Sequence, residues 1–178
     1  FTHFVIHFHR KTFPCCKPPL SCKLCHMLTL KPMECAFSEA EKAFAQDEVP
    51  VGAVIVDIQS GKIIAFAHNE MVGQKDPTAH AELLAIQRAC LSIETSRLED
   101  CDIYITLEPC PMCAQAISFA RLRRLYFGAY DPKGGGVDHG ARIFNAPSCH
   151  HIPEIIGGVE EQKCGQILKD FFEKKRGV

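Results

Sequence analysis

Hydrophobic and polar positions divide the first half of the chain into a helix and a hairpin. Between residues 33 and 46, apolar side chains recur every three or four positions, which predicts an amphipathic helix. Residues 49–57 are almost continuously apolar and rich in valine, as expected of a strand that is buried on both faces. Turn residues at 59–62 separate this run from a second apolar run at 63–68, so the two runs are predicted to pair as a hairpin.

Strand and helix patterns alternate along the rest of the chain. Polar or glycine-rich loops are expected at 69–78 and 131–140. The remaining elements are predicted to be helices at 80–91, 111–122 and 159–176, and strands at 101–107, 124–130 and 152–158. A hairpin followed by strand–helix alternation favours an α/β fold, a three-layer α/β/α sandwich with a mixed sheet of about five strands.

Charge and composition indicate one domain with an N-terminal extension. The 178 residues carry 20 basic and 21 acidic side chains, which excludes a strongly basic, histone-like chain and an acidic disordered one. Residues 1–33 contain no Asp or Glu and five basic residues, which leaves a net charge of −6 on the other 145 residues. We therefore expect a disordered extension over 1–32 and a folded domain over 33–178.

Neither a membrane span nor a disulfide framework is expected. No segment approaches 18 consecutive apolar residues. The eleven cysteines are an odd number, and the N-terminal stretch lacks the apolar run and the cleavage site of a signal peptide. We therefore expect a cytoplasmic protein with reduced thiols, some of which bind metal.

Two short strings carry the candidate chemistry. His80 and Glu82 form an H-x-E string at the start of one predicted helix, and Cys110 and Cys113 belong to a P-C-x-x-C string at the start of another. Cysteines three residues apart in a first helical turn face the same side, and a helix N-terminus stabilises their thiolates. With His80 they make a set of three zinc ligands, which leaves a fourth position for water.

Glu82 is assigned to proton transfer rather than to the metal. It is too close to His80 in the chain to bind the same ion easily, but it is well placed beside a bound water. Zinc lowers the pKa of such a water to about 7, and a carboxylate can pass the proton to a leaving group. H-x-E followed by P-C-x-x-C is the known signature of zinc deaminases. The alternatives are a structural zinc site that lacks its fourth ligand, and two unrelated strings.

Longer stretches resemble the bacterial tRNA-specific adenosine deaminases. They are VPVGAVIV (49–56), Asn69, DPTAHAE (76–82), TLEPCPMC (106–113) and FGAYDPKGGG (127–136). The similarity runs from about Met33 to the end, which makes 33–178 a zinc deaminase domain, and residues 1–32 match nothing in the family. The resemblance implies a cytidine-deaminase-like fold, a homodimer with one zinc ion per chain, and conversion of the wobble adenosine of an arginine tRNA to inosine.

The resemblance also assigns substrate contacts. Asn69 matches an asparagine that hydrogen-bonds the flipped base, and Asp131 matches a loop aspartate near the target nucleotide. Phe171 and Phe172 match a helix that lines the groove for the anticodon loop. The metal ligands and the proton shuttle fall on the residues that the two strings already indicate.

Basic residues are expected to bind RNA phosphates although the domain as a whole is acidic. The candidates are Lys133, beside the glycine-rich loop, and Lys174, Lys175 and Arg176 at the end of the last helix. One rival function is a free nucleobase or nucleoside deaminase of the guanine or cytosine type, which would close the pocket with its C-terminal segment. Another is a non-catalytic, zinc-bearing RNA-binding relative, which would be expected to lack Glu82.

Two stretches rich in cysteine and histidine can each be interpreted in several ways. CKLCH (22–26) has the pattern of a haem attachment site, without a visible export signal. A second zinc site, a flexible tail or translated upstream sequence are the alternatives there. His150 and His151, which follow Cys149, are interpreted as a solvated pair or an RNA contact in preference to a second metal site.

Overall fold

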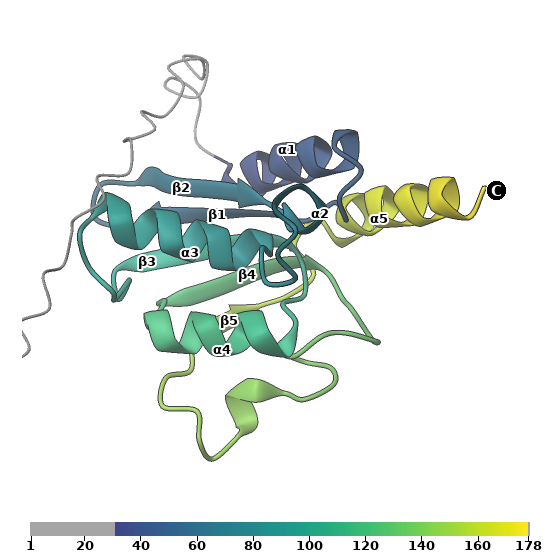
Figure 1. The fold of residues 1–178 in the computed structure, drawn as a ribbon. Helices are drawn as coiled ribbons and strands as arrows, with labels where there is room; N and C mark the ends of the chain where they lie inside the picture. The colour runs from purple at the N-terminus through teal and green to yellow at the C-terminus, as the bar shows by residue number, and fades with distance from the viewer. Residues whose placement is uncertain (1–30, 178) are drawn as a thin grey trace, which may run out of the picture. The chain divides into compact units, whose positions relative to one another are not determined.

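A five-stranded sheet runs through residues 31–177, the part of the chain that the computed structural model describes (Figure 1). Except for Lys31 and Pro32, the predicted extension 1–32 lies outside the described residues. The elements in chain order are α1 (Pro32–Ala45), β1 (Gly52–Asp57), β2 (Lys62–His68), α2 (Met71–Gln74), α3 (Ala81–Ser92), β3 (Cys101–Leu107), α4 (Pro111–Ala120), β4 (Arg124–Ala129), the 3-10 helix η2 (Ile143–Asn145), β5 (Glu154–Ile156) and α5 (Glu161–Arg176).

The sheet combines an antiparallel and a parallel half. Its strand order is β2-β1-β3-β4-β5. β1 pairs antiparallel with β2, as the predicted hairpin requires, and also antiparallel with β3. β3, β4 and β5 are parallel, with α4 crossing between the first two. The predicted mixed sheet is therefore confirmed.

Alternate residues of the central strands face two different helical layers. In β1, Ala53 and Ile55 belong to the core formed with α3 and α4, whereas Val54 and Val56 belong to the core formed with α1 and α5. Side chains alternate between the faces of a strand, so a strand covered on both faces is apolar at every position. This arrangement confirms the three-layer α/β/α prediction (Figure 1).

Helix α1 lies directly against the start of β1. A Cβ atom at Gly52 would lie 2.0 Å from the carbonyl oxygen of Ala36 and 2.6 Å from the backbone nitrogen of Ala40, both in α1. The absence of a side chain at this position allows the helix backbone to approach the strand. This close approach fixes the helix that also supports α5 on the same face.

The structure corrects one loop and several boundaries. The expected loop 69–78 contains the short helix α2, whose Val72 and Gly73 N–H groups donate to the buried carboxylate of Glu48 at 2.7 and 2.8 Å. That contact is distant in sequence, so the local pattern did not reveal it. Helix α4 ends at Ala120 instead of residue 122, because Arg121 is left-handed with φ 55°. The last strand, expected over 152–158, is reduced to the three residues of β5.

Within residues 31–177, no helix is both long enough and apolar enough to span a bilayer.

Replacement of Gly52 by alanine should destabilise the protein. The added methyl group meets backbone atoms of α1, so the helix must move away from the sheet. Overpacking of this kind costs about 1–3 kcal/mol, and we expect the melting temperature to fall by about 3–10 °C in thermal denaturation. Gly165→Ala in α5 is the control, because its nearest new contact is the Cβ of Ala129 at 3.9 Å and alanine favours a helix. An unchanged melting temperature for Gly52→Ala would contradict the tight packing of α1 on β1.

Candidate active site

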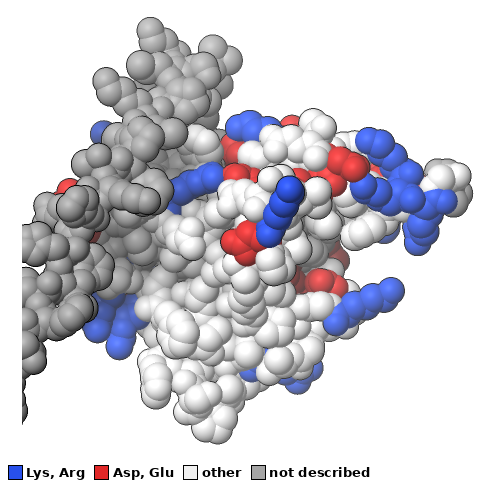
Figure 2. Space-filling view, in the orientation of Figure 1, with Lys and Arg blue, Asp and Glu red and all other residues white. Residues whose placement is uncertain are grey.

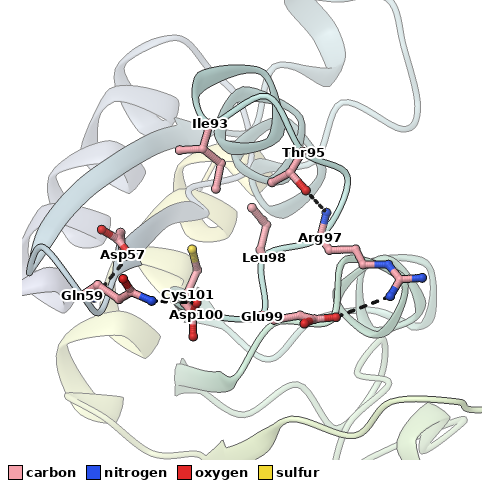
Figure 3. A pocket seen from close by; sticks show the side chains of 9 residues that line it. All are labelled: Asp57, Gln59, Ile93, Thr95, Arg97, Leu98, Glu99, Asp100 and Cys101. Carbon is pink, nitrogen blue, oxygen red and sulfur yellow. Dashed lines mark hydrogen bonds and ion pairs between the residues drawn. The ribbon is translucent and has the colours of Figure 1, made fainter.

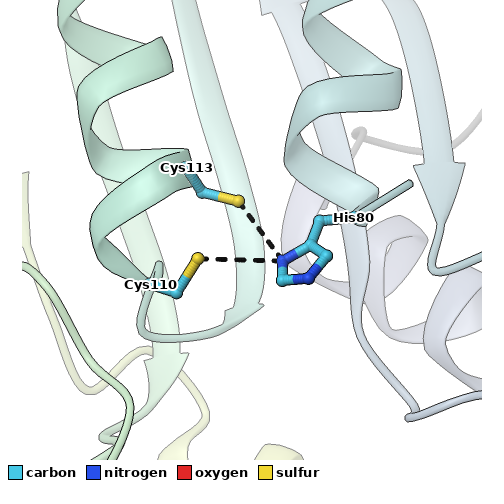
Figure 4. Close-up of side chains that lie close together, drawn as sticks. All are labelled: His80, Cys110 and Cys113. Atoms are coloured by element: carbon cyan, nitrogen blue, oxygen red, sulfur yellow. Dashed lines mark hydrogen bonds between the residues drawn. The ribbon is translucent and has the colours of Figure 1, made fainter. Parts of the chain in front are cut away.

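The two motifs meet because two helices begin at the same edge of the sheet. His80 is the residue before the first turn of α3, and Cys110 is the residue before the first turn of α4. Cys113 lies inside that turn of α4. Figure 4 shows the three side chains converging from the N-terminal ends of the two helices.

The distances within this set suit a tetrahedral metal ion. Nδ1 of His80 lies 3.5 Å from Sγ of Cys113 and 3.7 Å from Sγ of Cys110. In a tetrahedral zinc site with Zn–S bonds of about 2.3 Å and Zn–N bonds of about 2.0 Å, nitrogen and sulfur ligands are separated by about 3.6 Å. The three ligand atoms lie within 4.8 Å of one another, and the described residues contain no second group of this kind. The set predicted from the sequence can therefore hold a metal ion.

The charges of the three side chains are coupled. A hydrogen bond from Cys113, followed by one from His80, lowers the pKa of Cys110 to about 4. The bond to Cys110 together with burial raises the pKa of Cys113, and the bond to Cys110 raises the pKa of His80. A metal ion binds cysteine as the thiolate, so a cation that binds both sulfurs competes with the protons on this set.

Glu82 is a buried carboxylate in the first turn of α3. Its exposed fraction is 4%, and its Oε2 is the one buried side-chain oxygen within residues 31–177 that has no hydrogen-bond partner. Burial raises the pKa of Glu82, because a desolvated carboxylate is costly to ionise. A buried, unpartnered oxygen beside a metal-binding set favours a role in proton transfer over one in stability.

A cavity of about 190 Å³ opens onto this set. Pockets for drug-sized ligands usually enclose about 300–1,000 Å³, so this one suits a single planar base. The amide oxygen of Asn69 accepts a hydrogen bond from the N–H of Ala81 at 2.9 Å, which leaves the amide NH₂ group as the donor. The cavity is lined by Val49, Val51, Asn69, Met71, His80, Glu82, Leu107, Glu108, Cys110, Asp131 and Gly134.

The loop after β4 contains Asp131 and Lys133, two of the residues expected to contact the substrate. Asp131 lines the cavity, and its Oδ1 accepts hydrogen bonds from the N–H groups of Lys133 and Gly134 at 3.1 and 3.0 Å. The side chain of Lys133 is exposed and is not part of the cavity lining. Asp131 is therefore part of the cavity wall, and Lys133 is not.

The two phenylalanines of α5 have different surroundings. Phe171 is 3% exposed and packs edge-on against Phe44 of α1, with 5.8 Å between the ring centres. Phe172 is 45% exposed. Phe171 therefore joins α5 to α1, and Phe172 is the ring of this pair that is available to a ligand.

The basic residues form a surface at the end of α5. The last turn of that helix carries Lys174, Lys175 and Arg176, and Figure 2 shows blue side chains gathered over this end of the molecule. Nζ of Lys174 lies 5.3 Å from the centre of the Phe44 ring, and Lys175 pairs with Asp47 just after α1. These contacts attach the basic surface to the C-terminal end of α1.

Of the other cysteine and histidine candidates, Cys149 and His151 have structural partners, whereas His150 is exposed. The solvated pair expected at 150–151 is therefore wrong for His151, because its ring contacts the backbone. Nε2 of His151 contacts the carbonyl oxygen of Leu122 at 2.7 Å. The Cys149 sulfur lies 3.3 Å from the Ser118 hydroxyl oxygen and donates to the carbonyl of His151. Within residues 31–177 no metal-binding group forms there, and CKLCH (22–26) is not described.

A larger hollow of about 530 Å³ lies elsewhere on the molecule, between the end of β1 and the start of β3 (Figure 3). Asp57 and Cys101 belong to its wall, and Gln59 and Asp100 hydrogen-bond each other across it. It contains no residue of either motif, so its size does not make it the reaction site.

Comparisons with known proteins agree with the geometry at the metal-binding set. The family model described as MafB19-like deaminase matches residues 28–176. A tRNA-specific adenosine deaminase from Agrobacterium fabrum is 51% identical over 144 residues, which cover 81% of this chain and 93% of that protein. The chain belongs to the tRNA-specific adenosine deaminase family.

Solved structures place this deaminase among enzymes that act on different bases. One, described in a study of A-to-I editing by tRNA:A34 deaminases at the wobble position of transfer RNA, has a TM-score of 0.75 and 50% identity over 77% of this chain and 98% of its own. A guanine deaminase from Bacillus subtilis has a TM-score of 0.55 and 31% identity over 83% of this chain and 92% of its own. The fold alone therefore does not select the base.

Glu108 is a site residue of this deaminase that the sequence analysis missed. It lines the cavity and is 2% exposed. Burial favours its neutral form, but hydrogen bonds from the backbone N–H groups of Asp131 and His139 outweigh that cost, and the pKa of Glu108 is lowered. An acidic residue between an apolar strand and the P-C-x-x-C string was the available signal in the sequence.

These side chains are suited to hydrolytic deamination. His80, Cys110 and Cys113 would hold a zinc ion here, and the bound metal would supply a water with a pKa of about 7. Glu82 lines the same cavity and is placed to accept a proton there and pass it to a departing amino group. The NH₂ group of Asn69, whose oxygen is already bound to the N–H of Ala81, is placed to orient a base in the cavity.

Glu82→Gln should abolish turnover without removing the metal. The amide cannot take up the proton, and Glu82 is not one of the three ligands. General acid–base groups contribute about 10²–10⁴-fold, and we expect at least that loss in kcat. Elemental analysis should still find one metal ion per chain, whereas Cys110→Ala should lose it. Turnover close to that of the wild type in Glu82→Gln would contradict the assigned role.

Proposed function

We propose that this chain hydrolyses the wobble adenosine of a tRNA anticodon loop to inosine, with zinc bound by His80, Cys110 and Cys113. The observation that carries the proposal is the buried carboxylate of Glu82, whose Oε2 has no hydrogen-bond partner, beside the metal-binding set in a small cavity. The family relationship supplies the substrate class. The sequence-based prediction of an arginine tRNA as the particular substrate is part of this proposal.

The small volume of the pocket, about 190 Å³, supports a base presented by RNA. A cavity for one base offers few contacts, so flanking nucleotides must supply most of the binding free energy through stacking and phosphate contacts. An anticodon loop is single-stranded, and extrusion of one base from it costs little. Phe172 and the cations of α5 provide an exposed ring and positive charge of the required kind.

We infer that two copies of the chain associate. Helix α4 has apolar side chains on more than one face: Ile117 is fully buried, whereas Phe119 is 70% exposed and Met112 is 37% exposed. A second copy of the chain would remove this apolar area from water. The homodimer and the cytoplasmic location both stay predictions made from the sequence.

Parallel deamination assays should distinguish the proposal from its rivals. The substrates are a tRNA with adenosine at the wobble position, its anticodon stem-loop, free adenosine, guanine and cytidine. We expect inosine from the two RNAs and no turnover of the free compounds. Turnover of guanine or cytidine without turnover of the stem-loop would replace the proposal by the free-base alternative. RNA binding without turnover of any substrate would favour the non-catalytic alternative.

Removal of the basic surface on α5 should weaken RNA binding and reduce its salt dependence. The variant Lys174→Ala/Lys175→Ala/Arg176→Ala removes up to three phosphate contacts. Each contact to a single strand contributes about 0.7 to the slope of log K against log salt, so the slope should fall by up to about 2. Fluorescence titration of the stem-loop with each protein at several salt concentrations gives the binding constants, and their salt dependence gives this slope.

A charge-matched variant provides the control for this test. Lys31, Lys62 and Arg97 are exposed cations at the start of α1, at the start of β2 and in the segment after α3. Their replacement by alanine changes the net charge equally but removes no cation from the end of α5. If both triple variants lose the same affinity, net charge rather than a local contact explains the effect.

A further inference from the structure

Loop 131–139 forms one wall of the base pocket without any regular secondary structure. It follows β4 directly, and its residues Asp131 and Gly134 line the cavity. Gly135, Gly136 and Val137 are nevertheless buried. A buried irregular segment needs partners for its backbone N–H groups, because unpaired buried donors are costly.

The carboxylate of Glu108 supplies those partners. Its Oε1 accepts hydrogen bonds from the N–H groups of Val137, Asp138 and His139 at 3.2, 2.9 and 2.9 Å. Its Oε2 accepts the N–H of Asp131 at 3.0 Å and contacts Nδ1 of His139 at 2.7 Å. The side chain is completely buried. A single carboxylate thus binds both ends of the loop.

The packing of the loop on this carboxylate leaves no spare room. A Cβ atom at Gly135 would lie 2.5 Å from both Cδ and Oε1 of Glu108. A Cβ atom at Gly136 would lie 2.7 Å from Cα of Pro111, and the N–H of Gly136 donates to the carbonyl of Pro109 at 2.8 Å. The glycine run that the sequence analysis interpreted only as a loop is therefore shaped to fit Glu108 and the start of α4.

We propose that Glu108 is a positioning residue for the substrate, which fixes loop 131–139 so that Asp131 stands at the mouth of the base pocket. The inference rests on the proposed function, since it concerns how the same pocket receives its nucleotide. Glu108 is not a metal ligand, because the metal-binding group contains only His80, Cys110 and Cys113 among the described residues. All the side-chain hydrogen bonds of Glu108 described above are made with residues of loop 131–139.

Glu108→Gln tests the proposal with little change in shape. The amide accepts at one end only, and its NH₂ group faces N–H donors at the other end, so one end of the loop loses its anchor. We expect amide hydrogen exchange in 131–139 to become at least tenfold faster, while the strand β1 is unaffected. We expect KM for the anticodon stem-loop to rise about tenfold with a smaller change in kcat, and the metal content to stay at one per chain.

Asp102→Asn is the matched control. Asp102 is also 2% exposed and lies near the start of β3, whereas Glu108 follows the end of that strand. Asp102 accepts two hydrogen bonds from Arg123, at 2.9 and 2.7 Å. Its replacement should lower the melting temperature but change neither the KM nor the exchange of loop 131–139. If Asp102→Asn raises KM as much as Glu108→Gln, the effect of Glu108 is one of general stability and the proposal is wrong.

Gly135→Ala provides a second variant that keeps the charge of Glu108. The new methyl group pushes the loop off the carboxylate, so it should give the same rise in KM and in loop exchange with the metal retained. Glu108→Asp keeps the negative charge on a shorter side chain. Its KM for the stem-loop should therefore lie between those of the wild type and Glu108→Gln. Loss of the metal in Glu108→Gln, or unchanged loop exchange in both Glu108→Gln and Gly135→Ala, would overturn the proposal. Activity of the wild type on the stem-loop, measured alongside, tests the proposed function separately.

Discussion

The parallel pairing of β3 with β4 is the constraint on which the site depends. A parallel pair needs a crossover connection, and here α4 begins just after β3 ends. The two strands end at the same level, because Leu107 pairs with Ala129 and the N–H of Glu108 donates to the carbonyl of Ala129 at 2.8 Å. The segments that follow them therefore meet. One brings the two cysteines, and the other brings the loop that starts at Asp131.

Three buried glutamates lie near this edge of the sheet. Two of them accept backbone hydrogen bonds, and the third has an oxygen without a hydrogen-bond partner. Glu48 accepts two N–H groups of α2, and Glu108 accepts those of loop 131–139. Both stabilise segments that supply pocket-lining residues, Met71 from α2 and Asp131 from the loop. Glu82 has an oxygen with no partner, although burial makes such an oxygen costly. The fold thus stabilises two of the pocket's walls with carboxylates and keeps the third carboxylate available for proton transfer.

The sequence predicted the parts of this molecule that depend on periodicity and on local motifs. The continuous apolar run of β1 indicated a strand covered on both faces, and the two strings indicated the metal-binding set, because both signals are contained in a few neighbouring residues. Helix α2 and loop 131–139 could not be predicted in the same way. Their conformations depend on Glu48 and Glu108, which lie more than 20 residues away in the chain. The burial of Phe171 depends on Phe44 in the same long-range manner.

Selection of an RNA substrate depends on surfaces outside the pocket. Residues 34–178 carry a net charge of −6, so a polyanion is repelled except where cations gather. The cations at the end of α5 are favoured there by the helix dipole, and their position relative to the pocket is set by the contact of Phe171 with Phe44 and by the Lys175–Asp47 pair. Helix α1 is in turn held on the sheet by its close approach at Gly52. The packing that stabilises this face of the fold therefore also sets the position of the cations that we propose as phosphate ligands. A deaminase of the same fold without such a surface would have to recognise its base inside the pocket alone.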